Sequence, residues 1–153
     1  MKVLLIHNKY GTPGGEDVVV EQEAKLLVDA GVFVVRFTLE NSIINGVVRS
    51  ISAALGTVFS IRSYFAVRKA IRRNRPDVVH VHNFFPLISP SVFYACSAEN
   101  VPTVLTLHNF RIVCPTSVLM HNGLATTRSI DNSPWWAVKH RVYRDSYVGS
   151  TLL

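Results

Sequence analysis

The sequence has few cysteines, no long apolar run and no export signal. Only Cys96 and Cys114 occur among its 153 residues, and two cysteines outside a C-x-x-C pair are too few for a disulfide framework. The apolar run 3–6 is far shorter than that of a signal peptide. No uninterrupted apolar run approaches the ~20 residues of a membrane span. We therefore expect a cytoplasmic protein.

Acidic residues are missing from one segment of the chain. The sequence has sixteen Lys and Arg against ten Asp and Glu, a net charge of +6. Six of the basic residues lie within 62–75, where no acid occurs, so the rest of the chain is neutral. Each basic group near anionic headgroups contributes ~1 kcal/mol to membrane attachment. The residues expected to face an anionic membrane surface are Arg68, Lys69, Arg72 and Arg73.

The basic segment has two alternative interpretations. A solvated helix face accounts for the charges without any partner. Nucleic-acid binding is disfavoured, because neither an aromatic platform nor a recognised reading motif accompanies the basic residues.

Alternating strand and helix patterns indicate an α/β fold. Apolar and β-branched runs predict strands at 2–6, 32–39, 77–82 and 102–107. Helical spacing predicts helices at 16–31, 43–59, 60–74 and from Ser89 or Ser91 towards Asn100. Strands that alternate with helices form parallel sheets with right-handed crossovers. The sequence therefore predicts a Rossmann-like, doubly wound parallel sheet with helices on both faces.

Two helical patterns carry further predictions. In the first helix, the residues at helical spacing are Val19, Glu23, Leu26, Leu27 and Ala30, and Gly31 marks its end. Residues 135–153 have the pattern of one amphipathic helix. A crossover helix normally leads to another strand, and none follows here. We therefore expect 1–153 to be a single domain, truncated after this helix, from a longer protein.

Three loops follow the carboxyl ends of the predicted strands, where open α/β sheets bind ligands. In the first loop, Gly14 and Gly15 allow close backbone approach before a helix whose unpaired amides attract anions. However, no G-x-G-x-x-G or Walker pattern is present, and Glu16 and Asp17 would repel a pyrophosphate. This loop favours a polyol such as a sugar, and a turn with acidic helix capping is the alternative.

Histidine ends the third and fourth strands. His82 precedes Asn83 and His108 precedes Asn109. An imidazole with its ordinary pKa of ~6.5 can bind hydroxyls or transfer protons near neutrality, and a hydrogen-bonded core histidine is the alternative. His80 shares a strand face with His82, as in a metal pair. No Asp, Glu or Cys stands beside them, so we expect no metal site.

Three motifs together resemble a known family. They read HNKYGTPGGEDV from His7, PDVVHVHNFFPLISP from Pro76 and VLTLHNFR from Val104. With the passage 135–144, they resemble the N-terminal domain of bacterial glycosyltransferases of family four over almost the whole chain. The resemblance implies a retaining GT-B enzyme of two Rossmann-like domains. This half would mainly bind the acceptor, and a C-terminal domain absent from this sequence would hold the nucleotide-sugar.

The resemblance also implies roles for the loop residues. Gly14 and Gly15 would lie against the donor phosphate or sugar, with Glu16 near the acceptor. His108 would be catalytic, supporting an oxocarbenium-like transition state by charge and position rather than by nucleophilic attack. The substrate-binding residues implied are Gly14, Gly15, Glu16, His82, Asn83 and Asn109.

The leading hypothesis is sugar transfer from a nucleotide-sugar to a glycan or lipid-linked acceptor in cell-surface polysaccharide biosynthesis. We expect no cofactor beyond the nucleotide-sugar co-substrate, no activity from this fragment alone, and attachment at the inner face of the cell membrane. A non-catalytic peripheral-membrane module is one alternative. A nicotinamide-dependent dehydrogenase is another, with Glu40 after the second strand as the ribose ligand.

Overall fold

The computed structural model describes residues 1–9, 11, 14–40 and 56–152. Within these residues the chain forms two compact units, Met1–Thr106 and Leu107–Leu153. Most of the predicted helix at 43–59 lies outside the described residues. The remaining strands and helices predicted for the first unit are all present.

The first unit is built on a parallel sheet. Its strands are β1 (Lys2–Lys9), β2 (Phe33–Glu40), β3 (Val78–Asn83) and β4 (Thr103–Leu105). Their order is β2-β1-β3-β4, and every neighbouring pair is parallel. The fold prediction is therefore confirmed as a Rossmann-like α/β sheet, with the central strand β1 extending three residues beyond its predicted end.

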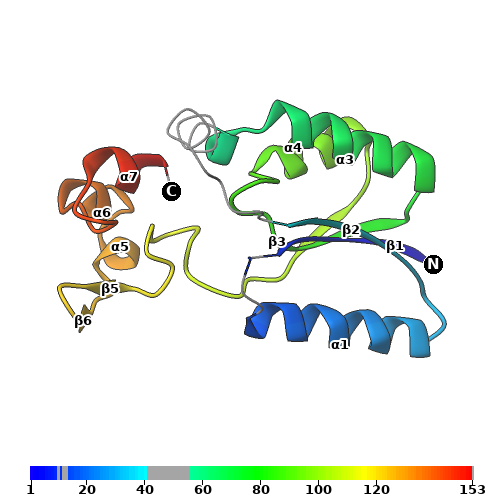
Figure 1. Cartoon of the computed structure of the whole chain (residues 1–153), viewed down its shortest axis with the longest axis horizontal. Coiled ribbons are helices and arrows are strands. Elements are labelled where there is room, and N and C mark those ends of the chain that lie inside the picture. The colour runs from blue at the N-terminus through cyan, green and yellow to red at the C-terminus, as the bar shows by residue number, and fades with distance from the viewer. Residues whose placement is uncertain (10, 12–13, 41–55, 153) are drawn as a thin grey trace. The chain divides into compact units, whose positions relative to one another are not determined.

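Helices cover both faces of this sheet (Figure 1). α1 (Gly15–Asp29) lies on one face, while α3 (Ile61–Asn74) and α4 (Ser91–Ala98) lie together on the other. Alternate residues of a strand point to opposite faces. As a result, Leu4 and Ile6 of β1 pack in the core beneath α3 and α4, whereas Leu5 packs beneath α1.

The two faces differ in character. The core under α3 and α4 is extensive and apolar, combining residues such as Val79 and Val81 of β3 with Val67 and Ile71 of α3. The buried cluster under α1 contains only Leu5, Val20 and Ala24, with Val34 at its margin. The sheet face under α1 therefore leaves room for polar side chains.

The helix predicted over 16–31 is present as α1, but the residues at helical spacing are not all on its buried side. Val19 and Leu26 are 40% and 67% exposed, while Val20 and Ala24 are buried. The small Ala24 side chain lets the helix backbone lie close to the sheet. Glu23, next to Ala24, is turned inward toward His80 and His82 of β3.

Buried serines fix the loop after β3. Ser89 Oγ accepts hydrogen bonds from the backbone N–H of Ser60 at 2.8 Å and of Ser91 at 3.3 Å, which joins the starts of α3 and α4. Ser63 Oγ donates to the carbonyl of Leu87 at 2.7 Å. Ser60 also caps α3 by accepting from Ser63 N–H. The loop is therefore held in place by both helices.

The second unit contains short elements. These are β5 (Met120–His121), β6 (Leu124–Ala125), α5 (Arg128–Asp131), α6 (Trp135–Lys139) and α7 (Tyr147–Leu152). The prediction of a continuous helix over 135–153 is wrong. Arg141, Arg144 and Asp145 adopt positive φ angles between α6 and α7, a conformation that a right-handed helix cannot contain.

Candidate functional site

The β1–α1 loop exposes the backbone of two glycines. The Gly14 N–H donates to Asp17 Oδ2 at 2.7 Å, so Asp17 caps the start of α1. Both Gly14 and Gly15 are exposed. A Cβ added at either would meet no described atom within 4 Å. This stretch of backbone is therefore open to a ligand.

A buried contact between a histidine and a carboxylate supports this loop from beneath. His7 of β1 is 1% exposed, and its Nε2 lies 3.0 Å from Asp17 Oδ1. Burial alone would raise the pKa of Asp17, but the hydrogen bonds from Gly14 N–H and His7 outweigh it and hold that pKa below its ordinary value. The sequence pattern predicts neither His7 nor Asp17 as a support of the site, because their contact depends on how α1 returns to the sheet.

Glu16 lies at the start of α1 with one oxygen enclosed. Its Oε2 is buried and has no hydrogen-bond partner among the residues that the structure describes. A buried acceptor without a partner is costly. The hydroxyl of a bound ligand would satisfy it, and the position of Glu16 near an acceptor stays a prediction.

His80, His82 and Glu23 form a polar cluster between β3 and α1. The two imidazole rings are 4.3 Å apart between centroids, as their shared strand face predicts. Glu23 places one carboxylate oxygen 2.8 Å from His80 Nδ1 and the other 3.6 Å from His82 Nε2. The premise that no acid stands beside these histidines is therefore wrong, because packing of α1 brings Glu23 to them from a distant part of the sequence.

His82 and Asn83 are both buried at the carboxyl end of β3. The His82 ring is 6.4 Å from that of His7, which brings the end of β3 next to the support of the Gly14–Gly15 loop. Asn83 Nδ2 donates to the carbonyl of Asn8 at 3.1 Å, and its Oδ1 accepts from Phe85 N–H. Asn83 thus orders this edge of the sheet, and substrate contact by either side chain stays a prediction.

His108 and Asn109 belong to the second unit. His108 is half-buried. Asn109 Oδ1 accepts from Arg111 N–H at 3.0 Å and so shapes the turn that follows. Their predicted catalytic and binding roles stay predictions.

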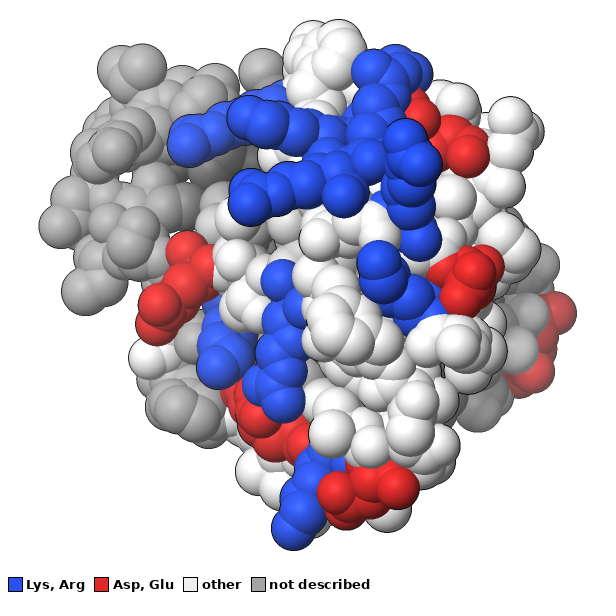
Figure 2. All heavy atoms as spheres, turned by 90° about the vertical axis from the view of Figure 1, so that its right-hand side faces the viewer, with Lys and Arg blue, Asp and Glu red and all other residues white. Residues whose placement is uncertain are grey.

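The basic residues of α3 line a groove on the surface of the first unit. It is formed by Phe65, Arg68, Lys69, Arg72 and Arg73. Figure 2 shows Lys and Arg side chains gathered on this part of the molecule.

The four basic residues are not equivalent. Glu99, which follows α4, accepts from Arg68 Nε at 2.6 Å and from Arg72 Nε at 2.9 Å. Hydrogen bonds from Arg72 and then Arg68 hold the pKa of Glu99 below its ordinary value, and the Glu99 bond raises the pKa of Arg68. Arg68 is only 23% exposed, whereas Arg72 is 63% exposed. Lys69 and Arg73 are exposed, and the structure shows no carboxylate partner for either among its described residues.

Comparison with known protein families identifies the chain. The model of Glycosyltransferase Family 4 matches residues 13–148. The chain belongs to glycosyltransferase family 4. No curated protein and no solved structure matches it.

In this family 4 member, the matched region includes the open glycines at the start of α1, the polar end of β3 and both histidines that close predicted strands. Family membership supports a glycosyltransferase-type enzyme, with sugar donor and acceptor as its substrates, over a dinucleotide-dependent dehydrogenase. In the part of the chain that the structure describes, no helix is long and apolar enough to cross a membrane.

Proposed function

We propose that this chain is the N-terminal, acceptor-side domain of a retaining GT-B glycosyltransferase. The enzyme would transfer a sugar from a nucleotide-sugar to a glycan or lipid-linked acceptor in bacterial cell-surface polysaccharide biosynthesis. A second, C-terminal domain would hold the nucleotide-sugar, and no other cofactor would be required.

Each site residue implied by the family resemblance has a role in this proposal. The backbone of Gly14 and Gly15 contacts the donor phosphate or sugar, and Glu16 accepts a hydrogen bond from an acceptor hydroxyl. His82, Asn83 and Asn109 order or contact the substrates. His108 stabilises the positive charge that develops on the transferred sugar.

Given the family assignment, one structural observation supports the proposal most directly. The open Gly14–Gly15 backbone lies directly before Glu16, whose buried oxygen has no partner among the described residues. The Gly14 N–H already donates to Asp17 and the helix start is acidic, so the open backbone suits the sugar of the donor better than its phosphate. An unpaired carboxylate suits a hydroxyl of the acceptor.

The test is sugar transfer by the product of the complete gene, assayed with a panel of labelled nucleotide-sugars and with membranes as the source of acceptor. We expect transfer with one donor and a loss of about 100-fold or more in His108→Ala. The 153-residue chain alone should give no turnover. Transfer by this chain alone, or full activity of His108→Ala, would contradict the proposed division of roles.

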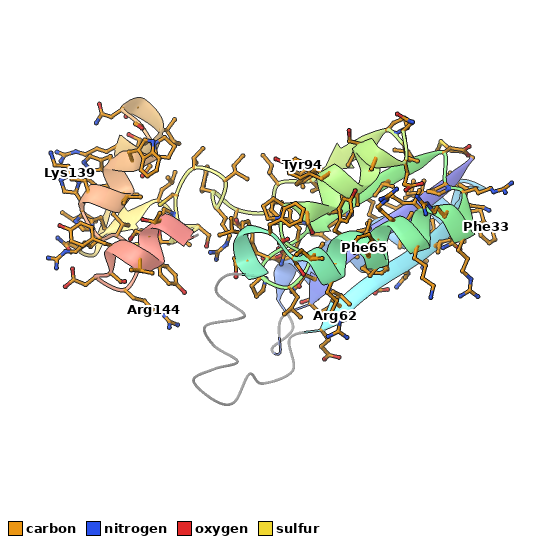
Figure 3. All side chains as sticks on the ribbon, turned by 90° about the horizontal axis from the view of Figure 1, so that it is seen from above. Phe33, Arg62, Phe65, Tyr94, Lys139 and Arg144 are labelled. Atoms are coloured by element: carbon orange, nitrogen blue, oxygen red, sulfur yellow. The ribbon has the colours of Figure 1, made fainter. Side chains whose placement is uncertain are left out.

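We further propose that the α3 groove attaches the enzyme to an anionic membrane surface. Apolar side chains lie exposed beside the charges: Phe65 is 59% and Ile61 66% exposed on α3, and Tyr94 is 63% exposed on α4. Figure 3 shows Phe65 and Tyr94 on the side of the first unit formed by α3 and α4. The expectation that no aromatic side chains accompany the basic residues is therefore wrong, since Phe65 lines the same groove. Basic groups with neighbouring aromatic side chains are typical of surfaces that lie in the membrane interface.

Cosedimentation of the chain with phosphatidylglycerol vesicles tests this attachment. Lys69→Ala/Arg73→Ala removes about 2 kcal/mol of attraction and should weaken binding about 30-fold. Substitution of Lys69 and Arg73 is preferable to substitution of Arg68 because it leaves the ion pairs of Glu99 intact. Lys25→Ala, an exposed lysine of α1, is the matched control and should bind as the wild type does. Equal binding of the double variant and the wild type would exclude the groove as the attachment surface.

A further inference from the structure

The polar cluster under α1 combines ligand types that metals prefer. His80 and His82 offer ring nitrogens from one face of β3, and Glu23 offers a carboxylate from α1. The three ligand atoms all lie within 4.8 Å of one another. We propose that Glu23, His80 and His82 form a binding site for a divalent transition metal, with Zn²⁺ as the ion that their chemistry favours.

The distances suit a small tetrahedral ion. Zn²⁺ lies about 2.0–2.2 Å from nitrogen and oxygen ligands, so ligand atoms around it are separated by roughly 3.3 Å. One Glu23 oxygen lies 2.8 Å from His80 Nδ1 and the other lies 3.6 Å from His82 Nε2. These two distances bracket the expected ligand–ligand separation. Small side-chain rotations would therefore place all three groups around one ion. Two histidines and one carboxylate leave a fourth position open to water.

The surroundings of His80 provide independent support. Its other ring nitrogen, Nε2, lies 2.8 Å from Thr106 Oγ1. A histidine that binds a metal donates its second ring N–H to a neighbouring oxygen, which fixes the tautomer and the ring orientation. When Nε2 donates to Thr106, the lone pair of Nδ1 points toward the space shared with Glu23.

The three ligands differ in burial, so the site is mostly enclosed but still accessible from solvent. The His82 side chain is fully buried and that of His80 is 12% exposed, whereas Glu23 is 31% exposed. An ion can therefore reach the cluster along the Glu23 carboxylate. Because two ligands come from β3 and one from α1, the bound ion cross-links the helix to the sheet. The bound ion would thereby stabilise the first unit.

The experiment titrates the metal-free chain with Zn²⁺ and follows thermal unfolding, then repeats the titration with Co²⁺ and its visible absorption. We expect one ion per chain, a melting temperature raised by about 5–10 °C at a hundredfold excess over Kd, and the intense bands of four-coordinate Co²⁺. Glu23→Gln removes the anionic ligand at a partly exposed position, and His82→Ala removes a buried one. Both variants should lose the saturable site. Thr106→Val should weaken binding at least tenfold.

Two control variants separate this site from adventitious binding. His121 and His140 form another close pair, with ring centroids 6.2 Å apart in the second unit. The double variant His121→Ala/His140→Ala should bind as the wild type does. Glu21→Gln, on the same helix as Glu23, should also bind normally. Absence of a saturable one-ion site, wild-type affinity in Glu23→Gln, or loss of binding in the His121/His140 variant would each overturn the proposal.

Discussion

At the scale of single residues, the side chains that shape the site act mostly beneath it. His7 supports the cap of α1 through Asp17, and Asn83 ties the end of β3 to β1. The groups left to a ligand are the Gly14 and Gly15 backbone and the enclosed oxygen of Glu16. Substrate binding at this edge should therefore be more sensitive to the loop backbone than to the buried histidines.

Gly15→Ala tests the open backbone. The added methyl group meets no described atom within 4 Å, so the melting temperature should not fall. Because the methyl group would occupy space assigned to the donor, sugar transfer by the complete gene product should drop at least tenfold.

The matched control is Gly56→Ala, since a Cβ there also meets no described atom. It should leave transfer unchanged. Unaltered activity in Gly15→Ala, or an equal loss in Gly56→Ala, would show that the β1–α1 loop does not contact the donor.

Ser89→Ala tests the hydroxyl network after β3. Ser89 is fully buried and its oxygen accepts from two backbone N–H groups, those of Ser60 and Ser91. Leaving a buried donor unpaired costs about 1–3 kcal/mol, and urea unfolding should show a loss of that size. Ser97→Ala, at an exposed position of α4, should change the free energy of unfolding by less than about 0.5 kcal/mol. Equal effects of the two variants would contradict the role of Ser89.

At the scale of elements, the sequence predicts well where the described strands and helices of the first unit lie, while most of the predicted helix at 43–59 falls outside the described residues. The apolar runs of β1 and β3 and the cap at Ser60 are strong local signals. Which side of α1 faces the sheet is harder to predict from the sequence, because it depends on the contact of Glu23 with histidines far along the chain. The prediction of one helix over 135–153 fails for a local reason. Its apolar spacing is helical, but residues with positive φ divide it.

The ion pairs between α3 and Glu99 predict a dependence of stability on pH. Arg72 and Arg68 lower the folded-state pKa of Glu99 from its ordinary 4.5. A lowered folded pKa contributes stability above the unfolded value, and this contribution is lost as the pH falls through the folded pKa. Glu99→Gln should therefore be less stable than the wild type at neutral pH.

The difference between the two proteins should shrink as the pH falls below 4.5 and disappear below the lowered folded-state pKa, where the carboxylate of folded wild-type Glu99 becomes protonated. Denaturant unfolding of the wild type and of Glu99→Gln, at neutral pH and at acidic pH, measures this difference in stability. A difference that stays constant from neutral to acidic pH would contradict the contribution of these ion pairs.

At the scale of the whole molecule, the family assignment is predicted from the sequence far better than the contacts between distant segments are. The motifs alone identify the family and the strand-end loops that belong to it. They do not reveal the cluster of His80, His82 and Glu23, since its members become neighbours only when α1 folds back on the sheet. Nor do they reveal that His7 and Asp17 meet. Contacts between distant segments are what the sequence pattern leaves undetermined.

Sugar binding by this domain can be tested by a nuclear magnetic resonance titration of the ¹⁵N-labelled chain with nucleotide-sugars and with lipid-linked glycan analogues. We predict weak, saturable shifts in the amide signals of residues 14–16 and 82–83, with little change at the opposite edge of the sheet. NAD should cause no comparable shifts. Shifts confined to other surfaces, or shifts at these loops with NAD and none with the sugar ligands, would contradict a sugar-binding role for this domain.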